Sequence, residues 1–207
     1  MTPLAYALWL AIRSDASADI MRGIANALPG GLADKDILAG QPLRAGGYGE
    51  DRSIYTQSLF APAGEEPRTV HLGLDIFAAA GAEVSTPIAG RVHSIRDNVN
   101  PGDYGPTLIL EHDAGDNRFH TLYGHLSRAS LEGLSPGRAF AAGERIAKLG
   151  RREENGGWPP HLHFQIILDI GNHEGDYPGV CRRSEQDRWL AICPDPRPLL
   201  GLAGEPF

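Results

Sequence analysis

His161-Leu162-His163-Phe164-Gln165 is a short segment with two histidines one residue apart, and it follows the Gly- and Pro-rich stretch 155–160. In an extended strand, residues i and i+2 project from the same face. Both imidazoles would therefore enter one space, while Leu162 and Phe164 point into a core. Paired imidazoles on a rigid strand suit a metal ligand beside a proton-transfer group. The segment predicts a β-strand that carries a chemical site on one face.

Two other segments contain further candidate ligands. His71-Leu-Gly-Leu-Asp75 lies upstream, and Leu122-Tyr-Gly-His125-Leu-Ser127 lies between it and the first segment. His71, Asp75 and one histidine of the 161/163 pair form a two-histidine, one-carboxylate set. Such a set leaves the fourth position of a tetrahedral zinc ion open to water, as a hydrolytic site requires. No Cys-x-x-Cys occurs in the chain, so a structural zinc finger is not expected.

The spacing between His71 and Asp75 sets a geometric condition. A fully extended segment 71–75 would place its ends about 13 Å apart, which is too far for two ligands of one ion. Gly73 permits a bend, because it lacks a Cβ and tolerates a positive φ. The apolar residues around it favour a bent strand over a helix.

The three segments read HxGxD, YGHLS and PHLHF. In this order and at these separations they resemble the LytM/lysostaphin-type zinc metallopeptidases, family M23, over the range 68–169. The resemblance implies that His71, Asp75 and His163 bind Zn²⁺. It also implies that the substrates are short peptide bonds in peptidoglycan.

The remaining two histidines, His125 and His161, are the catalytic candidates. The resemblance places both beside the metal-bound water. One of them would take the proton of the attacking water, and the other would stabilise the charge that develops on the tetrahedral intermediate. The sequence leaves open which histidine has which role.

One stretch departs from the family pattern. The family often has Gly, Ser and Thr before PHLHF, whereas this chain has Arg151-Arg-Glu-Glu-Asn-Gly-Gly-Trp-Pro159. Because this stretch borders the predicted groove, substrate preference is the property that the departure would change. The segment around PHLHF also resembles the metallopeptidase segment of some multidomain proteins with an aminotransferase module.

Composition and charge limit the classes of partner. The chain has 207 residues and a formal net charge of −7, and its longest basic runs are two arginines. Nucleic acid is therefore not an expected partner. Cys181 and Cys193 are the two cysteines, and their spacing allows either a disulfide that closes a small loop or two buried thiols. The apparently non-secretory start of the chain favours the reduced form. If the chain is part of a longer protein, the other domains of that protein are further partners.

The apolar stretch 4–12 bears on location. It is too short to span a membrane, and it lacks the positive start and the cleavage site of a signal peptide. The sequence therefore predicts a cytoplasmic protein without a membrane span. The family resemblance implies the periplasm or cell envelope instead.

Three segments are expected along the chain. They are a helical and loop extension over 1–67, a metallopeptidase domain over 68–169, and an extension over 170–207 that packs on this domain. Within the domain, short β-prone runs alternate with turns, at 69–77, 90–96, 107–112, 119–123, 145–150 and 161–168. We expect a mainly β fold, an antiparallel β-sandwich or flattened barrel-like sheet, with an N-terminal helical extension. One short helix is expected near 184–192.

Three other functions stay open at this point. A non-catalytic zinc-binding scaffold with this fold is disfavoured, because all five site positions keep their residues. An amidohydrolase acting on a small cytoplasmic amide would fit a chain without an export signal. A phosphocarrier with two facing histidines would leave Asp75 unexplained.

Overall fold

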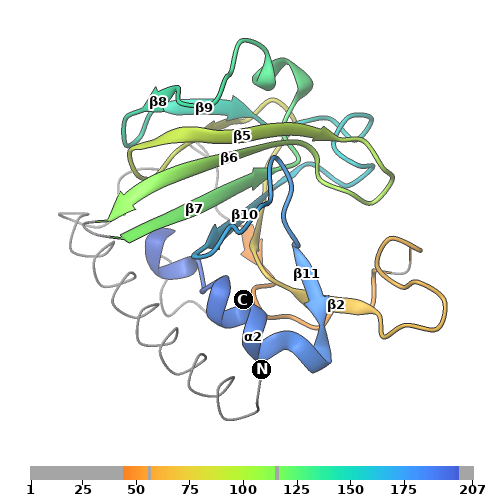
Figure 1. The fold of residues 1–207 in the computed structure, drawn as a ribbon. Helices are drawn as coiled ribbons and strands as arrows, with labels where there is room; N and C mark the ends of the chain where they lie inside the picture. Colours follow the sequence, from red (N-terminus) through yellow and green to blue (C-terminus); the bar gives the residue numbers. More distant parts are fainter. Residues whose placement is uncertain (1–43, 56, 115–116, 201–207) are drawn as a thin grey trace.

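The computed structural model describes residues 44–200, apart from residues 56 and 115–116. This part of the chain is mainly β-structure, as predicted, with a few short helices (Figure 1). The strands are β1 (Arg44–Gly46), β2 (Arg68–His71), β3 (Leu74–Phe77), β4 (Glu83–Ser85), β5 (Gly90–Asn98), β6 (Gly105–Ala114), β7 (Asn117–Gly124), β8 (Ala139–Phe140), β9 (Arg145–Lys148), β10 (His161–Ile167) and β11 (Val180–Arg182). The helices are α2 (Gln186–Ile192) and the 3-10 helices η2 (Arg128–Leu131), η3 (Arg183–Glu185) and η4 (Arg197–Leu200).

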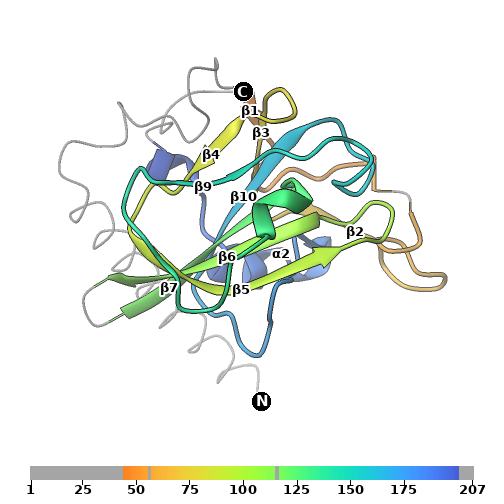
Figure 2. The ribbon, with the colours of Figure 1, turned by 90° about the horizontal axis from the view of Figure 1, so that it is seen from above.

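Seven strands form one antiparallel sheet in the order β1-β3-β10-β7-β6-β5-β8. Two small sheets, β11–β2 and β4–β9, accompany it, and Figure 2 shows β4 beside β9. Of the two predicted arrangements, the described residues form the barrel-like one, as a curled half-barrel sheet, and they do not form the two large facing sheets of a β-sandwich. The predicted N-terminal helical extension lies outside the described residues.

The period-2 alternation predicted for the histidine strand is present in β10. Leu162, Phe164 and Ile166 are fully buried in the larger apolar cluster, which the β4–β9 pair also covers. Ile167 faces the opposite side of the sheet, in a second cluster that includes Ile192 of α2. The two histidines of β10 share this second face, since they have the parity of Ile167.

The run 69–77, predicted as one strand, is two strands that pair with different partners. β2 ends at His71 and pairs with β11, whereas β3 begins at Leu74 and pairs with β1 and β10. The chain changes direction at Leu72 and Gly73. This break brings His71 back toward Asp75, as the spacing of the motif required.

The C-terminal part begins with β11 and continues through η3 into α2, close to the helix expected near 184–192. Figure 1 shows α2 beside β11. Within the described residues, no helix is both long and apolar enough to cross a membrane. The division of the chain at 67/68 and 169/170 stays a prediction.

Candidate metal centre and active site

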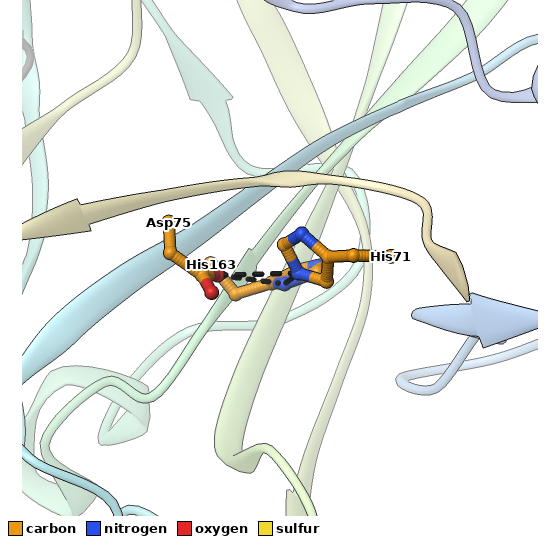
Figure 3. Close-up of side chains that lie close together, drawn as sticks. All are labelled: His71, Asp75 and His163. Carbon is orange, nitrogen blue, oxygen red and sulfur yellow. Dashed lines mark hydrogen bonds and ion pairs between the residues drawn. The ribbon is translucent and has the colours of Figure 1, made fainter. Parts of the chain in front are cut away.

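The three predicted metal ligands converge on one point between β2, β3 and β10. His71 is the last residue of β2, and Asp75 of β3 is the cross-strand neighbour of His163 on β10. The distance from His71 Nε2 to His163 Nδ1 is 3.0 Å, and each nitrogen lies 3.3 Å from Asp75 Oδ1. Figure 3 shows the three side chains pointing toward one another. All three residues are buried, and their donor atoms could hold a metal ion.

The separations fit a tetrahedral zinc ion. Zn–N and Zn–O bonds of 2.0–2.1 Å with tetrahedral angles place neighbouring ligand atoms about 3.3 Å apart. The other nitrogen of each ring already has a partner: His71 Nδ1 lies 3.0 Å from the Gly47 carbonyl oxygen, and His163 Nε2 lies 3.0 Å from Gln165 Oε1. If each of these nitrogens donates its proton, His71 Nε2 and His163 Nδ1 are left with free lone pairs. The donor set therefore suits Zn²⁺ in both chemistry and spacing.

The charge of the site favours an ionised carboxylate. Burial alone would raise the pKa of Asp75, but the neighbouring imidazoles of His71 and His163 hold this pKa well below its usual range. Burial also lowers the pKa of His163, so its ring is neutral near pH 7. A neutral imidazole and an ionised carboxylate are the ligand forms that a metal requires.

The two remaining histidines lie beside this cluster. His161 Nε2 is 3.7 Å from Asp75 Oδ1, and the ring centres of His161 and His125 are 4.3 Å apart. His161 Nδ1 lies 2.7 Å from the Pro159 carbonyl oxygen, and His125 Nδ1 lies 2.8 Å from that of Asn155. Both Nδ1 atoms therefore donate to a carbonyl oxygen, which leaves each Nε2 unprotonated. Burial lowers the pKa of both rings, that of His125 the more strongly.

His125 reaches the site through an unusual backbone conformation. β7 ends at Gly124, and His125 has a φ of 62°, the one positive φ of a non-glycine residue in the described chain. The strand alternation therefore stops before His125. Tyr123, which alternation would place on the same face as His125, is instead fully buried in the opposite cluster. His120 lies away from the site, 3.7 Å from Glu111 and against the His93 ring.

A pocket of about 770 Å³ opens at the cluster. All five predicted site residues line it, together with residues that sequence reasoning did not single out. These additional residues include Arg52, Tyr55 and Tyr104, whereas Trp158 belongs to the stretch 151–159 that the sequence placed at the groove. Arg52 Nη1 lies 2.5 Å from Asp75 Oδ2, and the Tyr104 hydroxyl lies 3.5 Å from His163 Nε2. The pKa of Tyr104 is raised well above the usual value by burial, so the hydroxyl keeps its proton.

Neither Arg52 nor Tyr104 belongs to a periodic segment. Arg52 precedes the first motif, in a loop-rich stretch, and Tyr104 directly precedes Gly105, the first residue of β6. The feature that points to Tyr104 is the close approach of two glycines, since a Cβ at Gly124 or Gly179 would collide with its ring or hydroxyl. That feature becomes visible only once the chain is folded.

Comparison with known proteins gives one family. The profile of Peptidase family M23 matches residues 69–174, just over half of the chain. No curated protein matches. Among solved structures, the catalytic domain of the antimicrobial peptidase lysostaphin from Staphylococcus simulans is 21% identical, with a TM-score of 0.50 and coverage of 77% of this chain and 92% of that chain. This likeness concerns the fold.

Two further similar structures are longer proteins. A zinc containing peptidase from Vibrio cholerae is 24% identical, with a TM-score of 0.45, and the match covers 62% of this chain and 33% of that chain. A putative peptidase M23 from Pseudomonas aeruginosa is 23% identical, with a TM-score of 0.43, and the match covers 64% of this chain and 44% of that chain. This chain thus spans less than half of either protein. On the matched profile and the placed donor set, the chain belongs to peptidase family M23, the zinc metallopeptidases.

Proposed function

We propose that this metallopeptidase is an endopeptidase that hydrolyses short peptide bonds in the stem peptides or cross-bridges of peptidoglycan. One observation carries the proposal: three donor atoms lie within 3.3 Å of one another, with two further imidazoles beside them. Membership of family M23 supports this substrate class, and the fold shared with the catalytic domain of the antimicrobial peptidase lysostaphin is consistent with it. Within this proposal, His71, Asp75 and His163 hold the metal.

His161 is the proposed general base. Zn²⁺, when bound, polarises the scissile carbonyl and lowers the pKa of a bound water molecule toward neutrality. His161 presents an unprotonated Nε2 3.7 Å from the Asp75 oxygen that faces the other ligands. A buried imidazole with a lowered pKa is neutral at pH 7 and can accept a proton from the attacking water.

The sequence leaves open which of the two histidines stabilises charge, and in this proposal His125 does not have that role. Its Nδ1–H donates to the Asn155 carbonyl, so the neutral ring has no N–H left for an oxyanion. We assign His125 as the second proton acceptor, which helps carry the proton from the water to the leaving amine. The buried, protonated hydroxyl of Tyr104 is the neutral donor that can stabilise the charge on the scissile carbonyl oxygen.

Single alanine variants test these roles. His161→Ala and His125→Ala should each lower kcat by about a hundredfold or more, which is the usual contribution of a positioned acid–base group, while zinc stays bound. His163→Ala should release the metal instead. Zinc content by metal analysis and single-turnover rates on a cleaved peptide are the measurements. Wild-type rates in both His161→Ala and His125→Ala would contradict the assignment of these histidines as proton acceptors.

The substrate class needs a separate experiment. We expect the zinc-loaded protein to cleave purified muropeptides, with products identified by mass spectrometry, and to leave small amides intact. Cleavage of the amides alone would favour a cytoplasmic amidohydrolase, and zinc binding without any cleavage would favour a scaffold. The comparisons do not support the resemblance to the aminotransferase-linked variant, so we do not propose that finer assignment. A peptidoglycan substrate implies action in the cell envelope, which fractionation of cells would test.

A further inference from the structure

A short turn upstream of the matched family range borders the metal centre. Residues 47–52, here called the upstream turn, run beside β2. The Gly49 N–H donates to the His71 carbonyl and the His71 N–H donates to the Glu50 carbonyl, both at 2.9 Å. The family profile begins at residue 69, so it assigns no role to these residues.

The upstream turn contacts two of the three metal donors on the side that faces away from the cluster. The Gly47 carbonyl oxygen lies 3.0 Å from His71 Nδ1. Arg52 Nη1 lies 2.5 Å from Asp75 Oδ2, whereas Oδ1 of the same carboxylate faces His71 and His163. These contacts leave His71 Nε2 and Asp75 Oδ1 as the atoms free to bind a metal.

Arg52 is itself held firmly. Its Nε–H donates to the Glu50 carboxylate at 2.8 Å and its Nη1 donates to the Tyr55 hydroxyl at 3.0 Å, and only 12% of its side chain is exposed. Gly47 provides the space for the guanidinium, since a Cβ there would lie 1.6 Å from Arg52 Nη2. A planar fork with several donors is needed to reach these partners together, which a lysine ammonium cannot reproduce.

We propose that Arg52 is a positioning residue that keeps Asp75 a one-oxygen ligand, and that the upstream turn is therefore part of the catalytic unit. A carboxylate that bound through both oxygens would use coordination space that an attacking water needs. A cation on Oδ2 also draws charge away from the carboxylate, so the bound metal stays more electron-poor. The inference rests on the metallopeptidase function proposed above.

Zinc affinity is the first test, measured by competition with a chromogenic chelator. Arg52→Gln should weaken zinc binding about 10- to 100-fold, the usual effect of losing an outer partner of a ligand, because the lost orientation of the carboxylate outweighs its increased basicity. Arg52→Lys keeps the charge without the fork and should fall between this variant and the wild type. Arg68→Gln is the matched control, because Arg68 contacts the Leu59 carbonyl and the Phe60 ring instead. Its zinc affinity should stay within about twofold of the wild type, since no ligand loses a partner.

The pH dependence of kcat/KM is the second test. In Arg52→Gln the acid limb should move to higher pH, because a more electron-rich centre raises the pKa of the water that must lose its proton. A residue that only supported the fold would lower stability without moving this limb. If Arg52→Gln fails to fold, the zinc affinity and the acid limb of Arg52→Lys test the positioning role instead.

Wild-type zinc affinity and an unmoved acid limb in a folded Arg52 variant would overturn the inference. Failure of the proposed function looks different: the wild type would then bind zinc but cleave no peptide. The affinity comparison between the Arg52 and Arg68 variants would still decide the positioning role.

Discussion

At the scale of single residues, Gly73 shows why the HxGxD spacing works. The sequence predicts that glycine permits a bend there, and the bend forms although Gly73 is not among the described glycines with a positive φ. Its importance is spatial. A Cβ at this position would lie 2.6 Å from two atoms of the His163 ring and 2.9 Å from the Phe164 carbonyl oxygen. The missing side chain therefore lets β10 bring its ligand against the chain between His71 and Asp75.

Gly73→Ala should consequently displace His163. We expect zinc affinity to fall about tenfold or more, because a ligand leaves its position. The free energy of unfolding should also fall by about 1–3 kcal/mol, the usual cost of overpacking. Chelator competition and urea denaturation measure the two effects. Gly46→Ala is the control, since a Cβ at Gly46 meets nothing within 4 Å. Equal zinc affinities for the two variants would contradict this account.

At the scale of elements, the strands with clear alternation were predictable. Runs at 90–96, 107–112, 119–123 and 161–168 correspond to β5, β6, β7 and β10, which have seven to ten residues each. The strands that were not predicted, β1, β4, β8 and β11, have only two or three residues each. So short a strand contains too few positions for a period of two to show. Its pairing depends on partners that are distant in the chain.

The end of β7 gives an element-scale prediction. A positive φ costs a residue with a Cβ about 1–2 kcal/mol, and glycine avoids this cost. His125→Gly should therefore be about 1 kcal/mol more stable than His125→Ala, the reverse of the usual order of these residues. Both variants lack the imidazole, so the difference isolates the backbone. Denaturation of both proteins in the presence of a chelator measures it, and a more stable alanine variant would show that the turn is unstrained.

At the scale of the whole molecule, the motif residues could be predicted from the sequence, but the residues that position them could not. The motifs indicate His71, Asp75 and one histidine of the 161/163 pair as metal ligands, and the resemblance to family M23 selects His163 from that pair. Arg52 precedes Asp75 by 23 residues, and no spacing rule joins the two. Its contact arises only when β1 pairs with β3 and the upstream turn pairs with β2. Local patterns thus indicate ligands, whereas the groups behind the ligands depend on the fold as a whole.

Acid stability is also a property of the whole molecule. His112 packs on Phe119, its Nδ1 lies 2.9 Å from the Ala89 carbonyl oxygen, and burial lowers its pKa to about 4. The fold therefore favours the neutral ring, and this stability is present above pH 6.5 and is lost as the pH falls toward 4. The loss should be on the order of 3 kcal/mol.

Urea denaturation of the chelator-treated protein between pH 7 and pH 4 tests this prediction. Chelation removes any contribution from acid release of zinc. His112→Gln should show a shallower decline in unfolding free energy than the wild type, because it removes one group with a lowered pKa. Parallel declines for the two proteins would mean that His112 titrates normally in the fold.

The contact between Arg52 and Asp75 has a practical consequence for anyone who trims this protein. A recombinant fragment cut at the first residue of the recognisable motif region would keep every histidine that the motifs name. It would lose the guanidinium behind the carboxylate and the carbonyl behind His71. Such a fragment would contain the family motifs but lack the two contacts that orient His71 and Asp75 for metal binding.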